Sequence, residues 1–243
     1  MRILIISDIH ANLAAFEAVL ADAEGQYDKI WFLGDLIGYG PDPNECVQLL
    51  QTFDHTALSG NHDWAVLNKL DITTFNAAAR MAITWTRAAI ADETRDYLES
   101  LPPLLTEGEF TLAHASPRQP VWEYILDMDT AAANFAHFDT PYCLVGHTHV
   151  PVVFALDEED DAVFPIMPDN ESPLILDGTR CIINPGSVGQ PRDRDPRAAY
   201  ALLDLETLSW QYRRVAYPVH QTQEKMRQAG MPPRLVERLE FGW

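Results

Sequence analysis

Five short motifs in the sequence combine residue types that bind metal ions, and each follows an apolar run. They are Ser7-Asp8-Ile9-His10, Leu33-Gly34-Asp35, Ser59-Gly60-Asn61-His62-Asp63, Leu112-Ala113-His114 and Val145-Gly146-His147-Thr148-His149. Loops beyond the carboxyl ends of strands lie together at one edge of an α/β fold, so residues distant in sequence can meet there. We therefore predict one cleft whose metal ligands are Asp8, His10, Asp35, Asn61, His114, His147 and His149.

Each motif taken alone is a weak indication of a metal site. An isolated histidine is more often a hydrogen-bonded structural residue than a ligand, and an Asp after a strand often only forms a turn. Chance explains the whole set poorly, because five of the eight histidines lie at the ends of apolar runs. Gly34, Gly60 and Gly146 accompany them, and glycine permits the sharp turns and close backbone approach that an ion site needs.

The ligand types indicate transition metals that act on a phosphate ester. Imidazole and carboxylate together suit Mn, Fe, Zn or Co, among which we expect Mn to support activity. Asp8 and Asp35 offset only part of the charge of two divalent ions, and the remainder attracts a phosphate. If Asp35 bridges two ions roughly 3.5 to 4 Å apart, the ions can share a hydroxide that attacks phosphorus directly, without a covalent enzyme intermediate.

His62 and Asp63 are predicted to have a catalytic role. Because His62 follows Asn61, its ring would lie beside the ions, and Asp63 would accept its other ring proton and keep the ring cationic. A cationic His62 can protonate the leaving oxygen as a general acid. The alternative is that His62 is only a turn residue.

Four further residues are candidates for contact with the substrate. Asn12 and Tyr39 follow metal-binding turns, and Arg118 and Arg192 lie in proline-containing loops near the same strand ends. Their side chains can donate hydrogen bonds to phosphate oxygens. The alternative for each arginine is an ordinary surface position.

The elements that must position these motifs change in type near Pro103. Before it, strands at 2–7, 29–33 and 55–59 alternate with helical patterns, which is typical of strands joined by crossover helices. After it, a second sheet is implied by strands at 104–105, 110–112, 142–145, 150–155 and 181–184, and by a hairpin of 200–205 with 210–215. The acidic run at 157–161 predicts a solvated hairpin tip.

Capping signals locate the helices. Asn12 can cap the first helix, and Asp42 the second, with Pro43 at its first position and Glu45 completing a capping box. A helical insert is expected at about 64–101, with Thr74 or Asp92 as caps, and a helical tail at about 218–240. We expect a single domain over 1–243.

The bulk composition excludes several classes of protein. Seventeen Lys and Arg against 36 Asp and Glu give a net charge of −19, which argues against an extended nucleic-acid-binding surface. The first apolar run is too short for a signal peptide, and no run approaches the ~20 residues of a membrane span. The three cysteines form no C-x-x-C pair and fit buried thiols in a reduced compartment, so a cytoplasmic protein is expected.

The ordered motifs resemble those of the calcineurin-like metallophosphoesterase superfamily, whose pattern is D-x-H, G-D, G-N-H-[DE], H and G-H-x-H. The resemblance implies an α/β fold with two stacked mixed β-sheets flanked by helices, an α/β/β/α sandwich. It also implies how the ligands divide: Asp8, His10 and His149 on one metal, Asn61, His114 and His147 on the other, and Asp35 between them.

Two segments, 34–44 and 184–192, are similar to a bacterial and archaeal branch of that family described as phosphodiesterase-like. Gly38-Tyr39-Gly40 stands where the protein-phosphatase branch carries Asp-Arg-Gly, so the arginine that would clamp a phosphomonoester is absent. Ala11 stands where many relatives have glycine. We expect it to narrow the pocket without loss of metal binding, unless the position requires a positive φ angle.

The function expected from these observations is metal-dependent hydrolysis of a small phosphate ester, and of a phosphodiester in particular. Two alternatives stay open: a phosphomonoesterase or phosphoprotein phosphatase of the same fold, and a metal-binding scaffold without turnover. Pocket shape decides the physiological substrate, and the sequence leaves this open, as it does the native metal, the oligomeric state and the role of the C-terminal tail.

Overall fold

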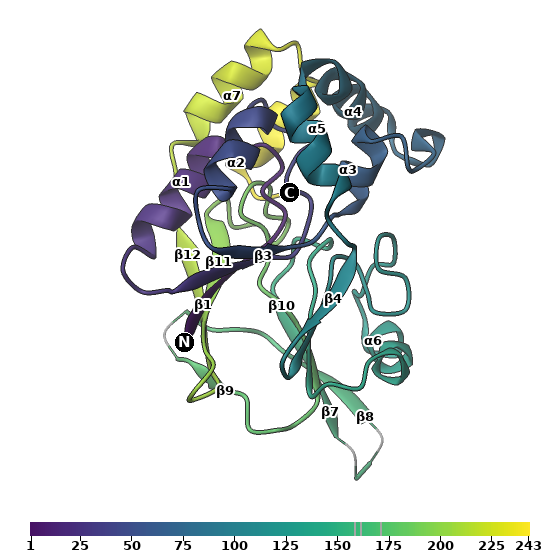
Figure 1. Cartoon of the computed structure of the whole chain (residues 1–243), viewed down its shortest axis with the longest axis vertical. Helices are drawn as coiled ribbons and strands as arrows, with labels where there is room; N and C mark the ends of the chain where they lie inside the picture. Colours follow the sequence, from purple (N-terminus) through teal and green to yellow (C-terminus); the bar gives the residue numbers. More distant parts are fainter. Residues whose placement is uncertain (158, 161, 171) are drawn as a thin grey trace.

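Two six-stranded sheets stack face to face in the computed structural model, which describes residues 1–243 apart from 158, 161 and 171 (Figure 1). The first sheet has the order β3 (His55–Ala57), β2 (Lys29–Phe32), β1 (Arg2–Ile6), β11 (Ala198–Asp204), β12 (Ser209–Val215), β9 (Leu174–Ile175). The second has the order β4 (Leu104–Glu107), β5 (Phe110–Ala113), β6 (Tyr142–Leu144), β10 (Cys181–Asn184), β7 (Val152–Asp157), β8 (Ala162–Ile166). Both sheets contain parallel and antiparallel pairs.

The central strand β1 shows why the sheets stack. Successive side chains of a strand point to opposite faces. Leu4 and Ile6 therefore pack toward the helices, whereas Ile3 and Ile5 pack between the two sheets. All four are fully buried, and burial of each such side chain contributes about 1.5 to 3 kcal/mol. This two-sided burial explains why the run is continuously apolar.

Helices cover the outer face of each sheet (Figure 1). The first sheet is covered by α1 (Leu13–Asp22), α2 (Pro43–Leu50), α3 (Asn61–Val66), α4 (Ala77–Ala89), α5 (Asp92–Glu99), α7 (Val219–Gln228) and α8 (Pro233–Glu237), with the short 3₁₀ turns η1 (Ile72–Thr74) and η3 (Arg238–Glu240). The second sheet is covered by α6 (Met128–Asn134) and η2 (Phe135–His137). The predicted α/β/β/α sandwich is confirmed.

Two capping predictions have different outcomes. Asn12 caps α1, because its side-chain oxygen accepts the backbone N–H of Ala15 at 3.3 Å. Asp42 stands at the N-cap of α2, but the predicted capping box is wrong. The Asp42 carboxylate accepts a hydrogen bond from Lys225 Nζ at 2.8 Å instead, because α7 packs close enough to capture it.

The insert and the tail are helical as expected, although the caps of the insert are wrong. Asn76, and not Thr74, caps α4, and Asp92 is the first residue of α5 while Ala91 precedes it as the cap. Residues 157 and 159–160 lie at the tip of the β7–β8 hairpin, and 158 and 161 lie outside the described residues. The strand β9 and the helix α6 were not predicted, and β8 was implied only as the second strand of the predicted hairpin. The extent of the domain stays a prediction.

Two bulk features agree with the composition. Cys46, Cys143 and Cys181 are buried free thiols, as predicted for small core side chains. None of the helices in the described part of the chain is long and apolar enough to cross a bilayer.

Candidate metal centre

The five motifs meet because each lies directly after a strand. The strands β1, β2 and β3 are mutually parallel, as are β5 and β6 in the facing sheet, so their carboxyl ends lie at one edge of the sandwich. Two buried groups of predicted ligands result, and within each group the ligand atoms lie no more than 4.8 Å apart. One group is Asp8, His10 and His149, and the other is Asp35, His114 and His147.

Asp35 belongs to the second group and also lies against the first. Its Oδ2 atom is 3.5 Å from Nε2 of His10 in one group and 3.5 Å from Nε2 of His114 in the other. Its second oxygen accepts the backbone N–H of His62 at 2.8 Å, which fixes the carboxylate. The side-chain oxygen of Asn61 is 3.2 Å from Nε2 of His114. The structure therefore brings all seven predicted ligands together.

The orientation of the histidines fits a cation. Nδ1 of His10, His114 and His149 each faces a backbone carbonyl oxygen, at 3.2, 2.9 and 2.5 Å. If these nitrogens carry the proton, as in most metal-binding histidines, each Nε2 presents a lone pair. Nε2 of His10 and Nε2 of His149 lie only 3.1 Å apart. Two facing lone pairs repel each other, and a cation between them removes the repulsion.

Positive φ angles concentrate at the predicted metal centre. Non-glycine residues with φ between 50° and 64° include Asp8, His10, Ala11, Asp35, Tyr39, His147 and His149. Such backbone strain persists only where the surroundings enforce it, and it clusters at functional sites. Ala11 has a φ of 53°, so its position does require the positive φ angle that favours glycine. An L-residue adopts such an angle at a cost of roughly 1 to 2 kcal/mol.

The glycines of the motifs are required by packing, as predicted. A Cβ on Gly60 would lie 2.1 Å from Oδ1 of Asp35, and one on Gly146 would lie 2.0 Å from Oγ of Ser7. The Ser7 hydroxyl in turn donates to Oδ2 of Asp8 at 2.7 Å. Any larger residue at either glycine would displace a predicted ligand.

Burial makes the carboxylates of this site costly to ionise. It raises the pKa of Asp8 to about 7, and burial with the nearby charge of Asp63 raises the pKa of Asp35 well above its usual range. Burial and neighbouring cationic groups lower the pKa of His10, His147 and His149. Neutral imidazoles beside carboxylates that are hard to charge are the arrangement that a bound cation stabilises.

The predicted pairing of Asp63 with His62 is wrong. Oδ2 of Asp63 accepts the backbone N–H groups of Asp35, Leu36 and Gly60 at 3.0, 3.3 and 2.8 Å, and Oδ1 accepts a fourth from the same loop at 3.2 Å. Nδ1 of His62 is buried without a partner. Burial, followed by the charge of Arg192, lowers the pKa of His62, so the ring is not held cationic. Asp63 instead holds the loop that carries Asp35.

Replacement of Asp63 by Asn is expected to lower the free energy of unfolding by about 2 to 4 kcal/mol. The amide keeps one acceptor oxygen but turns a donor toward backbone N–H groups, and a hydrogen bond to a charged group contributes about 1.5 to 3 kcal/mol. Urea unfolding, carried out after a chelator has removed bound metal ions, measures the change in the free energy of unfolding. Asp96→Asn, at an exposed position on α5, should cost less than about 0.5 kcal/mol. A loss in Asp63→Asn no larger than in this control contradicts the role.

Two of the four predicted substrate contacts have partners within the protein. The Asn12 side chain is buried, and besides capping α1 it donates to the carbonyl of Gly189 at 2.9 Å and accepts from Thr222 Oγ1 at 2.8 Å. The Arg118 guanidinium forms an ion pair with Glu123. Both donors of the Asn12 amide are occupied, because it also donates to the hydroxyl of Tyr217 at 3.2 Å. Glu123 holds Nε and Nη2 of Arg118, and contact of Arg118 with a substrate stays a prediction.

The other two candidates lie at the metal centre. The Tyr39 ring packs 4.7 Å from the His10 ring and 4.2 Å from the His62 ring, measured between centroids. Cζ of Arg192 lies 6.0 Å from the centroid of Tyr39, and the backbone N–H of Arg192 donates to the carbonyl of His149 at 3.2 Å. Their contact with a substrate stays a prediction.

The loop after His114 contributes residues that the sequence did not indicate. The Tyr124 ring stacks on His147 with a centroid separation of 3.9 Å, and the carbonyl of Trp122 lies 3.3 Å from Nε2 of His147. Glu123 anchors this loop by accepting hydrogen bonds from Ser116 and from Asn134 of α6, both at 2.8 Å. In the sequence, the aromatic residues Trp122 and Tyr124 follow the predicted ligand His114 closely, and this pattern could have indicated them.

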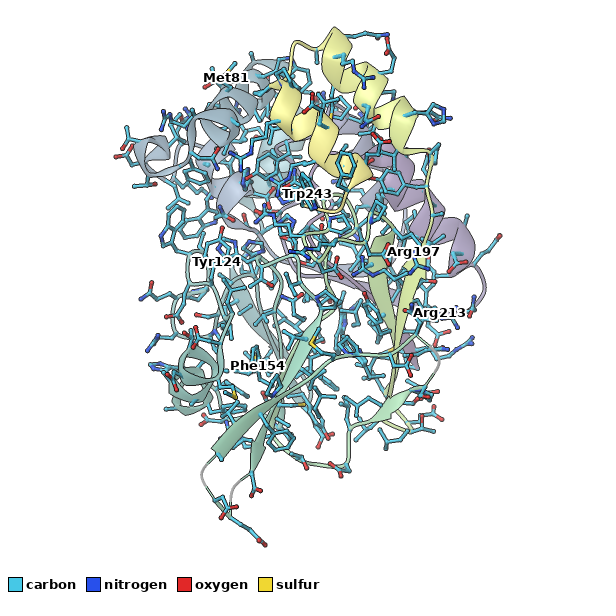
Figure 2. All side chains as sticks on the ribbon, turned by 180° about the vertical axis from the view of Figure 1, so that it is seen from behind. Met81, Tyr124, Phe154, Arg197, Arg213 and Trp243 are labelled. Carbon is cyan, nitrogen blue, oxygen red and sulfur yellow. The ribbon has the colours of Figure 1, made fainter. Side chains whose placement is uncertain are left out.

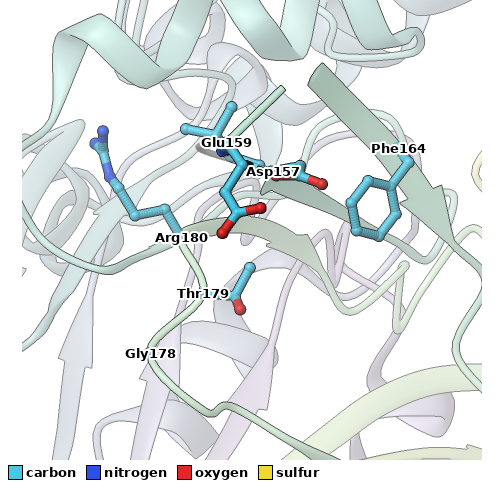
Figure 3. Close-up of a pocket in the computed structure, with 7 residues that line it drawn as sticks. Asp157, Glu159, Phe164, Gly178, Thr179 and Arg180 are labelled. Carbon is cyan, nitrogen blue, oxygen red and sulfur yellow. Dashed lines mark hydrogen bonds between the residues drawn. The ribbon is translucent and has the colours of Figure 1, made fainter. Parts of the chain in front are cut away.

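A pocket at the opposite end of the second sheet has no part in this centre. Figure 3 shows it beside the β7–β8 hairpin, lined by Asp157, Glu159, Phe164, Gly178, Thr179 and Arg180, with Leu156 completing the lining. The Arg180 guanidinium donates to the carbonyls of two residues of the η2 region. None of the five metal-binding motifs contributes to this pocket.

Comparison with known proteins agrees with this geometry. A family model described as a calcineurin-like phosphoesterase superfamily domain matches residues 1–208. The chain is similar to a metallophosphoesterase from Sphaerobacter thermophilus, with a TM-score of 0.91 and 50% identity over 100% of this chain and 99% of that one. An uncharacterised protein of Methanocaldococcus jannaschii is 38% identical over 99% of this chain and 98% of its own length.

A more distant similarity is to a protein of Yersinia enterocolitica named a symmetrical bis(5'-nucleosyl)-tetraphosphatase. The identity is 27% over 179 residues, which is 71% of this chain and 56% of that protein. The matched region therefore spans little more than half of the relative.

Proposed function

This chain belongs to the calcineurin-like phosphoesterase superfamily, and from that premise we propose that it hydrolyses small phosphodiesters with two divalent metal ions bound at the centre described above. That the chain is a hydrolytic phosphoesterase follows from the family. The observation that carries the finer proposal is the position of Asp35, whose Oδ2 lies 3.5 Å from a histidine nitrogen of each ligand group.

The seven ligands divide between two ions as the family resemblance implies. Asp8, His10 and His149 would hold one ion, and Asn61, His114 and His147 the other, with Asp35 shared. Bound ions would supply Lewis acidity toward phosphoryl oxygens and would lower the pKa of water. The mixed imidazole and carboxylate set suits Mn, Fe, Zn or Co, and Mn is our choice for the assay.

His62 is the proposed general acid. Its backbone N–H holds Asp35, its ring lies 4.9 Å from the His10 ring, and its Nδ1 atom is buried without a partner in the protein. A substrate phosphate brings negative charge close to this ring, and an opposite charge favours the protonated imidazole. The ring can then deliver its proton to the departing oxygen.

A diester is favoured over a monoester by the residues after Asp35. Leu36, Ile37 and Gly38 follow it, so no arginine of the loop can clamp the additional charge of a monoester. The name of the Yersinia relative supports a small nucleotide ester as the substrate class. A scaffold without turnover is disfavoured, because the chain keeps all seven ligands together with His62.

The test is hydrolysis of bis-p-nitrophenyl phosphate by the Mn²⁺-loaded protein. We expect turnover that disappears on chelation with EDTA, returns when Mn²⁺ is restored, and exceeds that of the monoester p-nitrophenyl phosphate. Bound metal with no hydrolysis of any ester would support the scaffold. Faster hydrolysis of the monoester would support the phosphomonoesterase.

A further inference from the structure

An apolar strip runs along the loop that leads from the metal centre to α6. Every second residue of this part of the loop exposes a large apolar side chain: Trp122, Tyr124, Leu126 and Met128 are 41%, 46%, 62% and 48% exposed. The residues between them hold the loop in place, because Ile125 is buried and Glu123 anchors the loop through Ser116 and Asn134. Contiguous exposed apolar side chains of this kind mark a binding surface.

The first two members of the apolar strip lie at the metal centre. The Tyr124 ring stacks on the ring of His147, with 3.9 Å between centroids. The Trp122 ring lies 5.2 Å from the ring of Phe75, which in turn lies 5.5 Å from the ring of His62. The strip therefore begins between a predicted metal ligand and the proposed general acid, where an ester group of a bound phosphate would emerge.

The other two members of the strip line a pocket on the outer face of the second sheet. The pocket has a volume of about 320 Å³ and is lined by Leu126 and Met128 together with Phe154 of β7 and Met167. Met167 is 65% exposed, whereas Phe154 is buried in the cluster that α6 covers. Figure 2 shows Phe154 on the same side of the molecule as Tyr124.

Two segments connect this pocket with the metal centre. Thr148 lines the pocket and stands between the predicted ligands His147 and His149. Leu126 lines it from the other segment and is two residues from Tyr124. Consecutive Cα atoms lie about 3.8 Å apart, so the wall of the pocket begins within one or two residue lengths of the centre.

The lining offers few free hydrogen-bonding groups. Of the lining residues that the structure describes, only Asp127 and Thr148 have polar side chains. The Asp127 carboxylate accepts the backbone N–H and the hydroxyl of Thr130 at 2.8 and 3.0 Å. Oγ1 of Thr148 accepts from Asn184 Nδ2 at 2.9 Å and from the backbone N–H of Val150 at 3.2 Å. A base or a sugar would lose hydrogen bonds to water on entering such a pocket, whereas an alkyl chain gains from burial.

We propose that the apolar strip and this pocket bind an extended alkyl group of the substrate. The substrate class is then a phosphodiester in which one of the two ester groups is an apolar chain. This inference rests on the proposed function, because the metal centre holds the phosphate from which the chain extends. It concerns one ester group only, and the second ester group stays free to be a nucleoside or another polar alcohol.

The test compares two diesters that share one leaving group, methyl p-nitrophenyl phosphate and octyl p-nitrophenyl phosphate. Both are assayed with the Mn²⁺-loaded protein below the critical micelle concentration of the octyl ester. Each methylene group that becomes buried should raise kcat/KM about fourfold, so the octyl ester should be favoured by roughly 50- to 250-fold if three or four are buried.

The double variant Met128→Gln, Met167→Gln removes apolar lining without a change of charge and with little change of shape. It should lower kcat/KM for the octyl ester by roughly tenfold, and the rate with the methyl ester should stay unchanged, because an alkyl chain gains little against an amide. Met81→Gln is the matched control, since Met81 is 57% exposed and lies on α4, well separated from Phe154 in Figure 2. The control should leave both rates unchanged.

A second readout does not require turnover. Octyl methylphosphonate and methyl methylphosphonate resemble the two substrates but resist hydrolysis, and calorimetric titration measures their binding to the Mn²⁺-loaded protein. The octyl compound should bind at least about tenfold more tightly than the methyl compound, and the double variant should remove most of this difference.

Equal kcat/KM for the two esters in wild-type protein, or a preference for the octyl ester that the double variant retains, would overturn the proposal. A preference that appears only above the critical micelle concentration would also overturn it, in favour of contact with an aggregate. A wild-type dimer that the double variant dissociates, with the preference unchanged, would assign the strip to contact between two copies of the chain. Failure of the proposed function is distinguishable, because wild-type protein would then hydrolyse neither ester, while the titration would still decide whether the pocket binds the octyl chain.

Discussion

Replacement of Asp35 by Asn is expected to lower kcat/KM for a phosphodiester by roughly 10³-fold or more, the largest effect of any single substitution that we predict. Asp35 is the only predicted ligand with an oxygen 3.5 Å from histidine nitrogens of both groups. The amide has nearly the same shape and removes only the negative charge. Metal ions contribute several kcal/mol to stabilising a phosphoryl transition state, and about 4 kcal/mol corresponds to this factor.

Metal content measured on the same samples connects the kinetic loss to its cause. Asp35→Asn should bind fewer than two ions per chain under conditions that saturate the wild type. Asp177→Asn, at an exposed position remote from the five motifs, should retain both full activity and full metal content. If Asp35→Asn keeps two ions and near-normal kcat/KM, Asp35 does not bridge them.

His62→Ala is expected to have the second largest effect, and its size should depend on the leaving group. A general acid accelerates departure of a poor leaving group by about 10²- to 10⁴-fold. For an alkyl phosphodiester we expect a loss of this size. For a p-nitrophenyl ester, whose departing oxygen needs little protonation, we expect a loss below about tenfold. The measurement is kcat/KM for both esters with the Mn²⁺-loaded variant.

The dependence on leaving group separates acid catalysis from a structural role of His62. A disturbed metal centre would slow both esters alike, because each needs the same ions. His220→Ala, an exposed histidine on α7, serves as the control and should change neither rate. Equal losses on the two esters would therefore exclude His62 as the proton donor.

The metal-binding motifs could be predicted from the sequence because the physics of each is local. A buried strand, a sharp turn and a ligand follow one another within a few residues, as in Leu33-Gly34-Asp35. Glycine at the turn is dictated by contacts such as that of Gly60 with Asp35. The edge at which these turns gather follows from parallel pairing of the strands, which the alternation of strands and helices indicates.

The partners of charged side chains could not be predicted in the same way. His62 and Asp63 are adjacent in sequence, but the first turn of α3 directs the Asp63 carboxylate back to the backbone of the Asp35 loop. Arg118 lies in the expected loop, yet Glu123 captures it. In both cases a nearby group takes the side chain that the sequence assigned to another partner. Only the three-dimensional path of the backbone decides which partner the side chain contacts.

The tail shows the limit imposed by sequence distance. A helical pattern near the end of the chain was sufficient to predict α7 and α8, because helix periodicity is a local property. That the segment after Arg238 docks on the loop of Arg192 depends on one glycine with a positive φ angle and on two backbone hydrogen bonds. No pattern in the sequence links these segments.

Anomalous scattering from crystals of the Mn²⁺-loaded protein, recorded at the manganese absorption edge, would test the binuclear centre directly. We predict two peaks per chain, one among Asp8, His10 and His149 and one among Asn61, His114 and His147, with Asp35 contacting both. A single peak, or peaks away from these seven side chains, would contradict the assignment of this edge of the sandwich as a two-metal phosphoesterase site.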